Sequence, residues 1–173
     1  MTQSVPMDSN AIFWLWGERF SLRGIEDDKK ANVALADVDE QGKTLTVYVH
    51  TGRMEHLLLY VRRWGKQCVL NTGSKYLKFW ENKLGLTPVS LVAKAMKTRW
   101  GSCAIHKRQV TLNTDLVHRN ARYLEYVLVH ELTHLFESGH GPQFYALLEA
   151  HIPDWRRLRD DLKLPFPPPD IGI

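Results

Sequence analysis

The sequence predicts an α+β fold with a small antiparallel sheet, a long N-terminal helix, a helix carrying a His-Glu-x-x-His motif, and short C-terminal helices. Residues 44–49 alternate polar and apolar side chains, which is typical of a half-buried strand. Residues 53–84 and 120–135 instead repeat apolar side chains at helical spacing. Both periodicities occur in one chain, so we expect a mixed fold.

Length and composition fit one domain of 173 residues, with 44% apolar and 24% charged residues. Two cysteines, Cys68 and Cys103, are too few for a disulfide scaffold and lack zinc-ribbon spacing. No apolar run approaches the roughly 20 residues that span a bilayer. Residues 1–10 lack the basic and apolar regions of a secretory signal. We expect a cytoplasmic protein with no membrane partner.

The charge is mildly basic, with a formal net charge of +4. Lysines and arginines are mixed with acidic residues rather than gathered in one block. A basic face could attract nucleic acid or phosphates, but a solvated surface explains each cluster more simply.

The first fifty residues are predicted to be mostly strands. Residues 12–22 are aromatic and β-prone, with Gly17 at a turn, and residues 32–38 and 44–50 are further short strands. They are expected to form an antiparallel sheet of two to four strands. The predicted parts of the single domain are an N-terminal β region (1–50), a helical segment (53–84), a metal-site core (89–162) and a Pro-rich tail (163–173).

The helical segment at 53–84 contains two glycines. Gly65 and Gly73 each cost a helix about 1 kcal/mol relative to alanine. We therefore expect either one long helix or two pieces broken near residues 71–73, with Gly85 ending the helix.

A hairpin with a long polar connection is predicted next. Residues 90–96 are β-prone and residues 109–113 alternate cleanly, which favours two antiparallel strands. A connection of this length is a candidate for function as well as for structure. Its candidate substrate-binding residues are Arg99, Trp100 and Ser102.

The helix at 120–135 begins near Asn120, a good N-cap residue, and is apolar nearly all round, which predicts burial. A carboxylate such as Glu131 is costly there unless it has a function. Gly139 is the expected C-terminal cap. Further helices are expected after Pro142 and after Asp154.

The motif itself predicts a metal site. His130 and His134 are four residues apart, so both imidazoles lie on one helix face and can reach one ion, with Glu131 beside them. His140 follows just past a glycine. Three nitrogen ligands with one open position are typical of catalytic zinc. Glu149 is an alternative third ligand, and a buried helix with merely hydrogen-bonded histidines is the structural alternative.

With these residues in view, the chain resembles the YgjP-like metal-dependent hydrolases, relatives of the SprT-like zincins. The resemblance runs from about residue 96 to 162. It implies a zincin-like α+β fold, one zinc ion held by His130, His134 and His140, and Glu131 as the catalytic base. The matching blocks are Met-Lys-Thr-Arg-Trp-Gly-Ser-Cys at 96–103, Val-Thr-Leu-Asn at 110–113, Tyr-Val-Leu-Val-His-Glu-Leu-Thr-His at 126–134, His-Gly-Pro-Gln-Phe-Tyr at 140–145 and Pro-Asp-Trp-Arg at 153–156.

Two related groups fit less well. Metzincins require a glycine where this chain has Glu137, and a downstream methionine, whereas no methionine follows Met96. Many SprT-like proteins carry a four-cysteine ribbon that two cysteines cannot build.

The expected function is zinc-dependent hydrolysis, most naturally of a peptide or protein substrate. One alternative is cleavage of a nucleotide phosphoanhydride, for which Lys97, Arg99, Lys107 and Arg108 would bind phosphates. Another is a nucleic-acid-binding module in which zinc is mainly structural.

Overall fold

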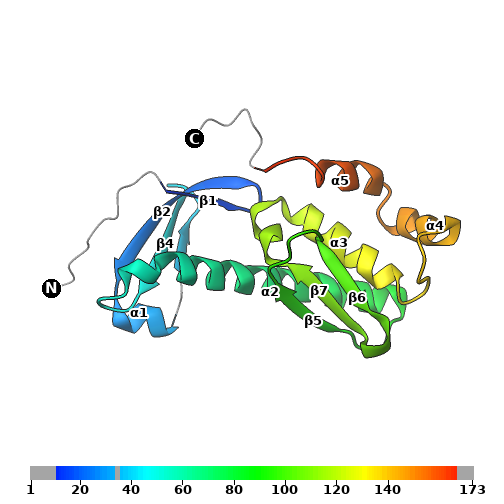
Figure 1. Ribbon diagram of the computed structural model, residues 1–173, viewed down its shortest axis with the longest axis horizontal. Helices are drawn as coiled ribbons and strands as arrows, with labels where there is room; N and C mark the ends of the chain where they lie inside the picture. The colour runs from blue at the N-terminus through cyan, green and yellow to red at the C-terminus, as the bar shows by residue number, and fades with distance from the viewer. Residues whose placement is uncertain (1–10, 34–35, 167–173) are drawn as a thin grey trace. The chain divides into compact units, whose positions relative to one another are not determined.

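The computed structural model describes residues 11–33 and 36–166, which fall into two compact units (Figure 1). The first unit takes its residues from Met1–Asn71 and Thr114–Ala121, and the second from Thr72–Asn113 and Arg122–Ile173. The expectation about residues 1–10 and most of the predicted Pro-rich tail lie outside the described residues. The single-domain division stays a prediction.

The first unit contains a four-stranded sheet in the order β1-β2-β4-β3. The turn between the first two strands is formed by Trp16 and Gly17, both with positive φ (51° and 86°), as expected for Gly17. Strands β2 and β4 pair in parallel, so the prediction of an antiparallel sheet is wrong here. The physical reason is the connection through α1 and β3, which returns the chain in its original direction. The strands are β1 (Ile12–Leu15), β2 (Glu18–Glu26), β3 (Ala36–Asp39) and β4 (Thr44–Val49).

Helix α1 (Asp28–Val33) replaces the start of a predicted strand, because residues 32–33 are helical rather than extended. The carboxylate of Asp27 accepts hydrogen bonds from the backbone N–H groups of Lys29 (3.1 Å) and Lys30 (3.0 Å). Such a side-chain cap satisfies N–H groups that have no partner within the helix. This capping signal was overlooked in the sequence.

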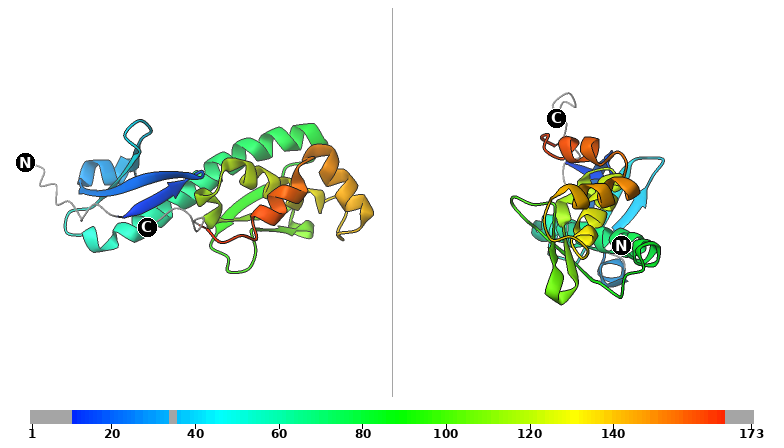
Figure 2. Two further views of the ribbon diagram at one scale, coloured as in Figure 1. Left: turned by 90° about the horizontal axis from the view of Figure 1, so that it is seen from above. Right: turned by 90° about the vertical axis from the view of Figure 1, so that its right-hand side faces the viewer.

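Helix α2 (Leu57–Leu84) is one continuous helix, as the left view of Figure 2 shows, and follows a short 3-10 turn, η1 (Met54–His56). Of the two alternatives, the single long helix is correct. At Gly73 a Cβ atom would lie 3.0 Å from Leu91 Cδ2 and 3.1 Å from Leu112 Cδ1. The glycine therefore lets α2 approach the second sheet closely, and this packing offsets its low helix propensity. Gly85 ends the helix with a φ of 62°.

The second unit contains a three-stranded sheet in the order β5-β7-β6. Strands β5 and β7 are parallel, so the predicted antiparallel hairpin between them is wrong. The connecting segment forms its own strand, β6, which pairs antiparallel with β7 and makes the actual hairpin. The elements are β5 (Ser90–Lys94), β6 (Gly101–Ala104), η2 (Ile105–Lys107) and β7 (Gln109–Asn113).

Three helices complete the second unit after η3 (Thr114–His118). Helix α3 packs on the sheet face that carries Gly101, since a Cβ there would meet Val127. Its apolar side chains are buried as predicted from their nearly all-round distribution. Pro142 occupies the first turn of α4, as expected. The helices are α3 (Ala121–Thr133), α4 (Pro142–His151) and α5 (Trp155–Asp161).

Candidate metal centre

Helix α3 ends at Thr133, so the prediction that Gly139 caps it is wrong. Backbone N–H groups of Leu135 and Phe136 donate to the carbonyls of Leu132 and Thr133, which tightens the chain into turns. Gly139 is not in the left-handed conformation that a glycine cap would use. The early end leaves six residues in which the chain can turn back and bring His140 beside α3.

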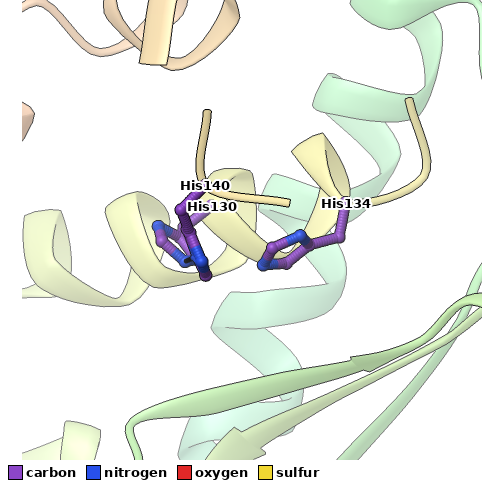
Figure 3. Close-up of side chains that lie close together, drawn as sticks. All are labelled: His130, His134 and His140. Atoms are coloured by element: carbon purple, nitrogen blue, oxygen red, sulfur yellow. Dashed lines mark hydrogen bonds between the residues drawn. The ribbon is translucent and has the colours of Figure 1, made fainter. Parts of the chain in front are cut away.

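Three histidine side chains converge in this region (Figure 3). Each of His130, His134 and His140 offers one nitrogen, and these atoms lie within 4.8 Å of one another. The Nε2 atoms of His130 and His140 are 3.0 Å apart. A tetrahedral zinc ion with bonds of 2.0–2.1 Å holds nitrogen ligands about 3.3 Å apart. The donor set and its spacing therefore fit a single metal ion.

Hydrogen bonding orients one of the three rings. His134 Nδ1 lies 3.2 Å from the carbonyl oxygen of Glu137, and a carbonyl can only accept, so Nδ1 carries the proton. Nε2 of His134 is then the lone-pair nitrogen. A metal-ligating histidine is commonly held in this way by a carbonyl on its other nitrogen.

Burial keeps His130 neutral. Loss of solvent, reinforced by His134 and His140, lowers the pKa of His130 to about 4. The pKa of His140 is also lowered, by burial and by His134. Metal ions bind the neutral imidazole, so in the metal-free state both rings are already in the binding form at neutral pH.

Phe144 of α4 lies against all three imidazoles and is fully buried. Its ring centroid is 4.9 Å from that of His130, 4.8 Å from His134 and 4.6 Å from His140. The sequence identified this residue only as part of the apolar face of a helix. Its position four residues after His140 was the one available signal.

Glu131 is 7% exposed and borders the same cavity as the histidines. Burial raises the pKa of its carboxyl to about 7, while the positive charge of Arg99 acts in the opposite direction. The carboxylate packs on β6 at Gly101, where a Cβ would lie 2.8 Å from Glu131 Oε1. Only glycine leaves room for it there.

Two cavities meet at this carboxylate. The larger has a volume of about 450 Å³, and the smaller about 230 Å³. Gly101, His130 and Glu131 border both. The larger is also lined by Arg99, Ser102, Cys103, Ile105, His134, Ser138 and His140.

The loop that carries the predicted substrate residues is held by Asn113, a buried residue at the end of β7. Its side-chain amide donates to the carbonyls of Met96 and Arg99, both at 2.9 Å. Arg99 is exposed at the larger cavity, and Trp100 borders the smaller one. Sequence reasoning missed the role of Asn113, because a polar residue ending a strand has many ordinary explanations.

Ser102 borders the larger cavity from β6, and so does Cys103, which the sequence did not single out. Glu149, the alternative third ligand, is exposed and lies outside the histidine cluster. Its carboxylate instead pairs with Arg156 at 2.8 and 3.1 Å.

The model of the family described as YgjP-like, metallopeptidase domain, matches residues 2–164. The chain belongs to the YgjP-like family. The resemblance found at residues 96–162 is thereby confirmed. The helices and the two sheets of the structure confirm the α+β class of the fold. A metallopeptidase domain implies a bound metal ion and a peptide substrate.

Two solved structures are similar to parts of this YgjP-like chain. The metallopeptidase zymogen of Pyrococcus abyssi abylysin is 22% identical, with a TM-score of 0.48, over 52% of this chain and 90% of that one. The metallopeptidase zymogen of Methanocaldococcus jannaschii jannalysin is 18% identical, with a TM-score of 0.46, over 55% of this chain and 87% of that one. The sequence has no match among the curated proteins.

The remaining expectations concern membranes, partners and location. Among the helices at residues 11–33 and 36–166, none combines the length and apolar character needed to cross a bilayer. Nothing in the family description points to a nucleotide or a nucleic acid as partner. The cytoplasmic location stays a prediction.

Proposed function

We propose that this YgjP-like protein is a zinc-dependent peptidase in which Glu131 acts as the general base. The observation that carries the proposal is the shared cavity of Glu131 and the three converging histidines. One group is suited to proton transfer and the others to holding a cation, and all of them reach the same solvent-accessible space.

His130, His134 and His140 would hold one zinc ion per chain through neutral imidazole nitrogens. Three protein ligands leave a coordination position open, which distinguishes catalytic from structural zinc. When bound, zinc lowers the pKa of water toward neutrality and polarises a carbonyl oxygen. Phe144 packs against the three rings and is itself fully buried.

Glu131 would accept a proton from the attacking water and later deliver it to the leaving amine. A general base works best when its pKa is near the working pH. Burial already brings the pKa of Glu131 to about 7 in the metal-free protein. Contact with Gly101 fixes the carboxylate in place, because the side chain cannot move further toward β6 without meeting its backbone.

An extended substrate would bind along β6. This strand pairs with β7 on one side and with no other strand of the described chain. A free strand edge can accept a peptide through backbone hydrogen bonds. Arg99 at the same cavity would bind a substrate carboxylate or the developing oxyanion, and Trp100 and Ser102 would shape the binding surface.

The decisive experiment is Glu131→Gln. The zinc-loaded variant should keep its metal content and fold but lose cleavage of a denatured protein substrate by at least about 100-fold. Glu149→Gln is the matched control, because that glutamate is exposed and pairs with Arg156. Unchanged cleavage in the Glu131 variant would rule out the proposed base.

The ligands are tested by metal analysis. His130→Ala, His134→Ala and His140→Ala should each lose most of their zinc after dialysis, since each removes one of three ligands. Stoichiometric zinc in His140→Ala, together with its loss in Glu149→Ala, would transfer the third position to Glu149.

A further inference from the structure

A second cavity, of about 230 Å³, is lined by Glu131 and His130 but by neither His134 nor His140. It is smaller than the roughly 300–1,000 Å³ of sites for drug-sized ligands, so it suits a single residue. Because it shares His130 and Glu131 with the metal-site cavity, a residue bound here would adjoin the bond under attack. Its other lining residues are Trp100, Gly101, Tyr126, Val127, Arg159, Leu162 and Lys163.

The walls of this second cavity are preformed and largely apolar. Tyr126 and Val127 are buried on α3, and Leu162 is buried just after α5. The indole N–H of Trp100 donates to the carbonyl of Leu162 at 3.2 Å, which ties the loop before β6 to the end of α5. A bound side chain would therefore enter a slot with buried apolar walls.

Two cations lie at this slot. Arg159 Nε and Lys163 Nζ both contact Asp160 Oδ1, at 3.1 and 2.7 Å, so one carboxylate faces two positive charges. Arg159 uses only its Nε in that contact, and its guanidinium lies 5.1 Å from the ring centroid of Trp155. The two terminal nitrogens of Arg159 make no hydrogen bond within the described residues and can bind a carboxylate in the bidentate manner.

A hydroxyl in the same cavity points to the same ligand. Tyr126 is 5% exposed as a residue and lines the cavity. Its hydroxyl is not among the buried side-chain atoms of residues 11–33 and 36–166 that lack a partner, so the hydroxyl can be solvated in the cavity and can donate to a ligand there. Tyr126 and Arg159 thus offer donors to a ligand, while the one carboxylate that lines the cavity, Glu131, stands where the cavity meets the metal site.

We propose that this cavity binds the substrate residue next to the scissile bond and selects one that carries a carboxylate, with Arg159 as the specificity-determining residue. The carboxylate belongs either to an Asp or Glu side chain or to the C-terminus of the peptide. The inference rests on the proposed peptidase function, since it assigns a preference to that site.

The kinetic test uses quenched fluorescent peptides in which Glu or Gln is placed in turn at each position. A parallel set ends in a free acid or an amide. We expect the zinc-loaded protein to cleave one carboxylate-bearing peptide about 10-fold more efficiently, in kcat/KM, than its neutral isostere. The peptide set that shows the preference identifies the source of the carboxylate, either a side chain or the C-terminus. If neither set shows a preference, the proposal is overturned.

Variants locate the preference. Within the Arg159→Gln variant, kcat/KM for the carboxylate-bearing peptide should equal that for its neutral isostere, and Arg159→Glu should favour Lys over Glu at that position. Arg156→Gln is the matched control, because it removes the same charge from α5 but lies outside the cavity. A preference that survives in both Arg159 variants would contradict the assignment.

A binding measurement separates this inference from the proposed chemistry. The acidic peptide and its neutral isostere are titrated into zinc-loaded Glu131→Gln protein, with the indole N–H resonance of Trp100 followed by NMR. We expect the acidic peptide to bind about 10-fold more tightly than the neutral one. This difference should disappear in the double variant that carries both Glu131→Gln and Arg159→Gln. If the native protein cleaves none of the peptides but the binding difference is present, only the peptidase proposal is refuted. Cleavage without any preference would refute the inference only.

Discussion

The Glu131 side chain lies directly against the backbone of Gly101. An ideal Cβ at position 101 would stand 2.8 Å from Glu131 Oε1 and 2.9 Å from Glu131 Cγ. The first residue of β6 therefore determines where the carboxylate of α3 can lie. This contact joins the strand proposed to bind substrate to the residue proposed to move the proton.

Gly101→Ala should displace the Glu131 carboxylate, because a Cβ this close to a buried side chain forces it to shift. We expect kcat to fall by about 10- to 100-fold, since small misplacements of a catalytic group are costly. Zinc content should be unchanged. Gly139→Ala is the control, because the nearest atom to a Cβ there is 3.8 Å away. Full activity in Gly101→Ala would show that the contact does not position Glu131.

Phe144→Ala should weaken both the fold and the metal site, because this ring packs against all three histidines. Removing a buried phenylalanine costs about 3–5 kcal/mol of unfolding free energy, measurable by urea denaturation. Zinc affinity, measured by chelator competition, should fall as the rings lose their support. Phe136→Ala is the comparison, since Phe136 is 51% exposed. Equal effects of the two changes would contradict the supporting role of Phe144.

Stability of the metal-free protein should depend on pH through two opposed groups. The pKa of Glu131 is raised to about 7, so its contribution to stability is present below its ordinary value of 4.5 and is lost as pH rises toward 7. The pKa of His130 is lowered to about 4, so its contribution is present above 6.5 and is lost as pH falls toward 4. The two largely cancel between about pH 4.5 and 6.5.

Glu131→Gln removes one of these groups. Between pH 4.5 and 7, the unfolding free energy of the metal-free variant should rise more steeply with pH than that of the native protein. At pH 8 it should exceed the native value by on the order of 2 kcal/mol, because no buried carboxyl has to ionise. Urea denaturation at pH 5 and pH 8 with chelator present measures this. Parallel pH profiles for the two proteins would mean that Glu131 is not buried as the structure has it.

Arg99→Gln should raise the pKa of Glu131 further in the metal-free protein, because the positive charge of Arg99 favours the ionised carboxylate. Carbon-13 NMR titration of the glutamate carboxyl groups measures the change directly. Lys107→Gln is the charge-matched comparison, from a residue that does not line either cavity beside Glu131. A pKa that falls in Arg99→Gln would contradict the electrostatic coupling.

The sequence alone located the metal motif, because its signal is local. The spacing of His130 and His134 predicts neighbouring rings on one helix face, and the two rings are neighbours, with centroids 5.3 Å apart, although α3 ends one residue before His134. The burial of Glu131 followed from apolar neighbours on all sides of the same helix. The strand at residues 44–49 and the long helix of residues 57–84 were likewise local patterns.

The errors of sequence interpretation arose where pairing or capping is decided by distant residues. The order of β5, β7 and β6 depends on which edges the hydrogen bonds join, and strand periodicity carries no such information. Residues 32–33 are helical because Asp27 caps α1, and α3 ends before Gly139 because turns follow it at once.

What the sequence by itself determined is the pair His130 and His134 with Glu131 beside them, since side chains four residues apart share a helix face. The third ligand was left open between His140 and Glu149. Only the tertiary structure decided what surrounds them. It placed Gly101 against Glu131 and Phe144 against the three histidines. In the folded chain the second cavity is also lined by Arg159, a residue of α5 that lies 28 positions after Glu131 in the sequence. Side chains so far apart along the chain meet only through packing, and packing is the information that a linear pattern lacks.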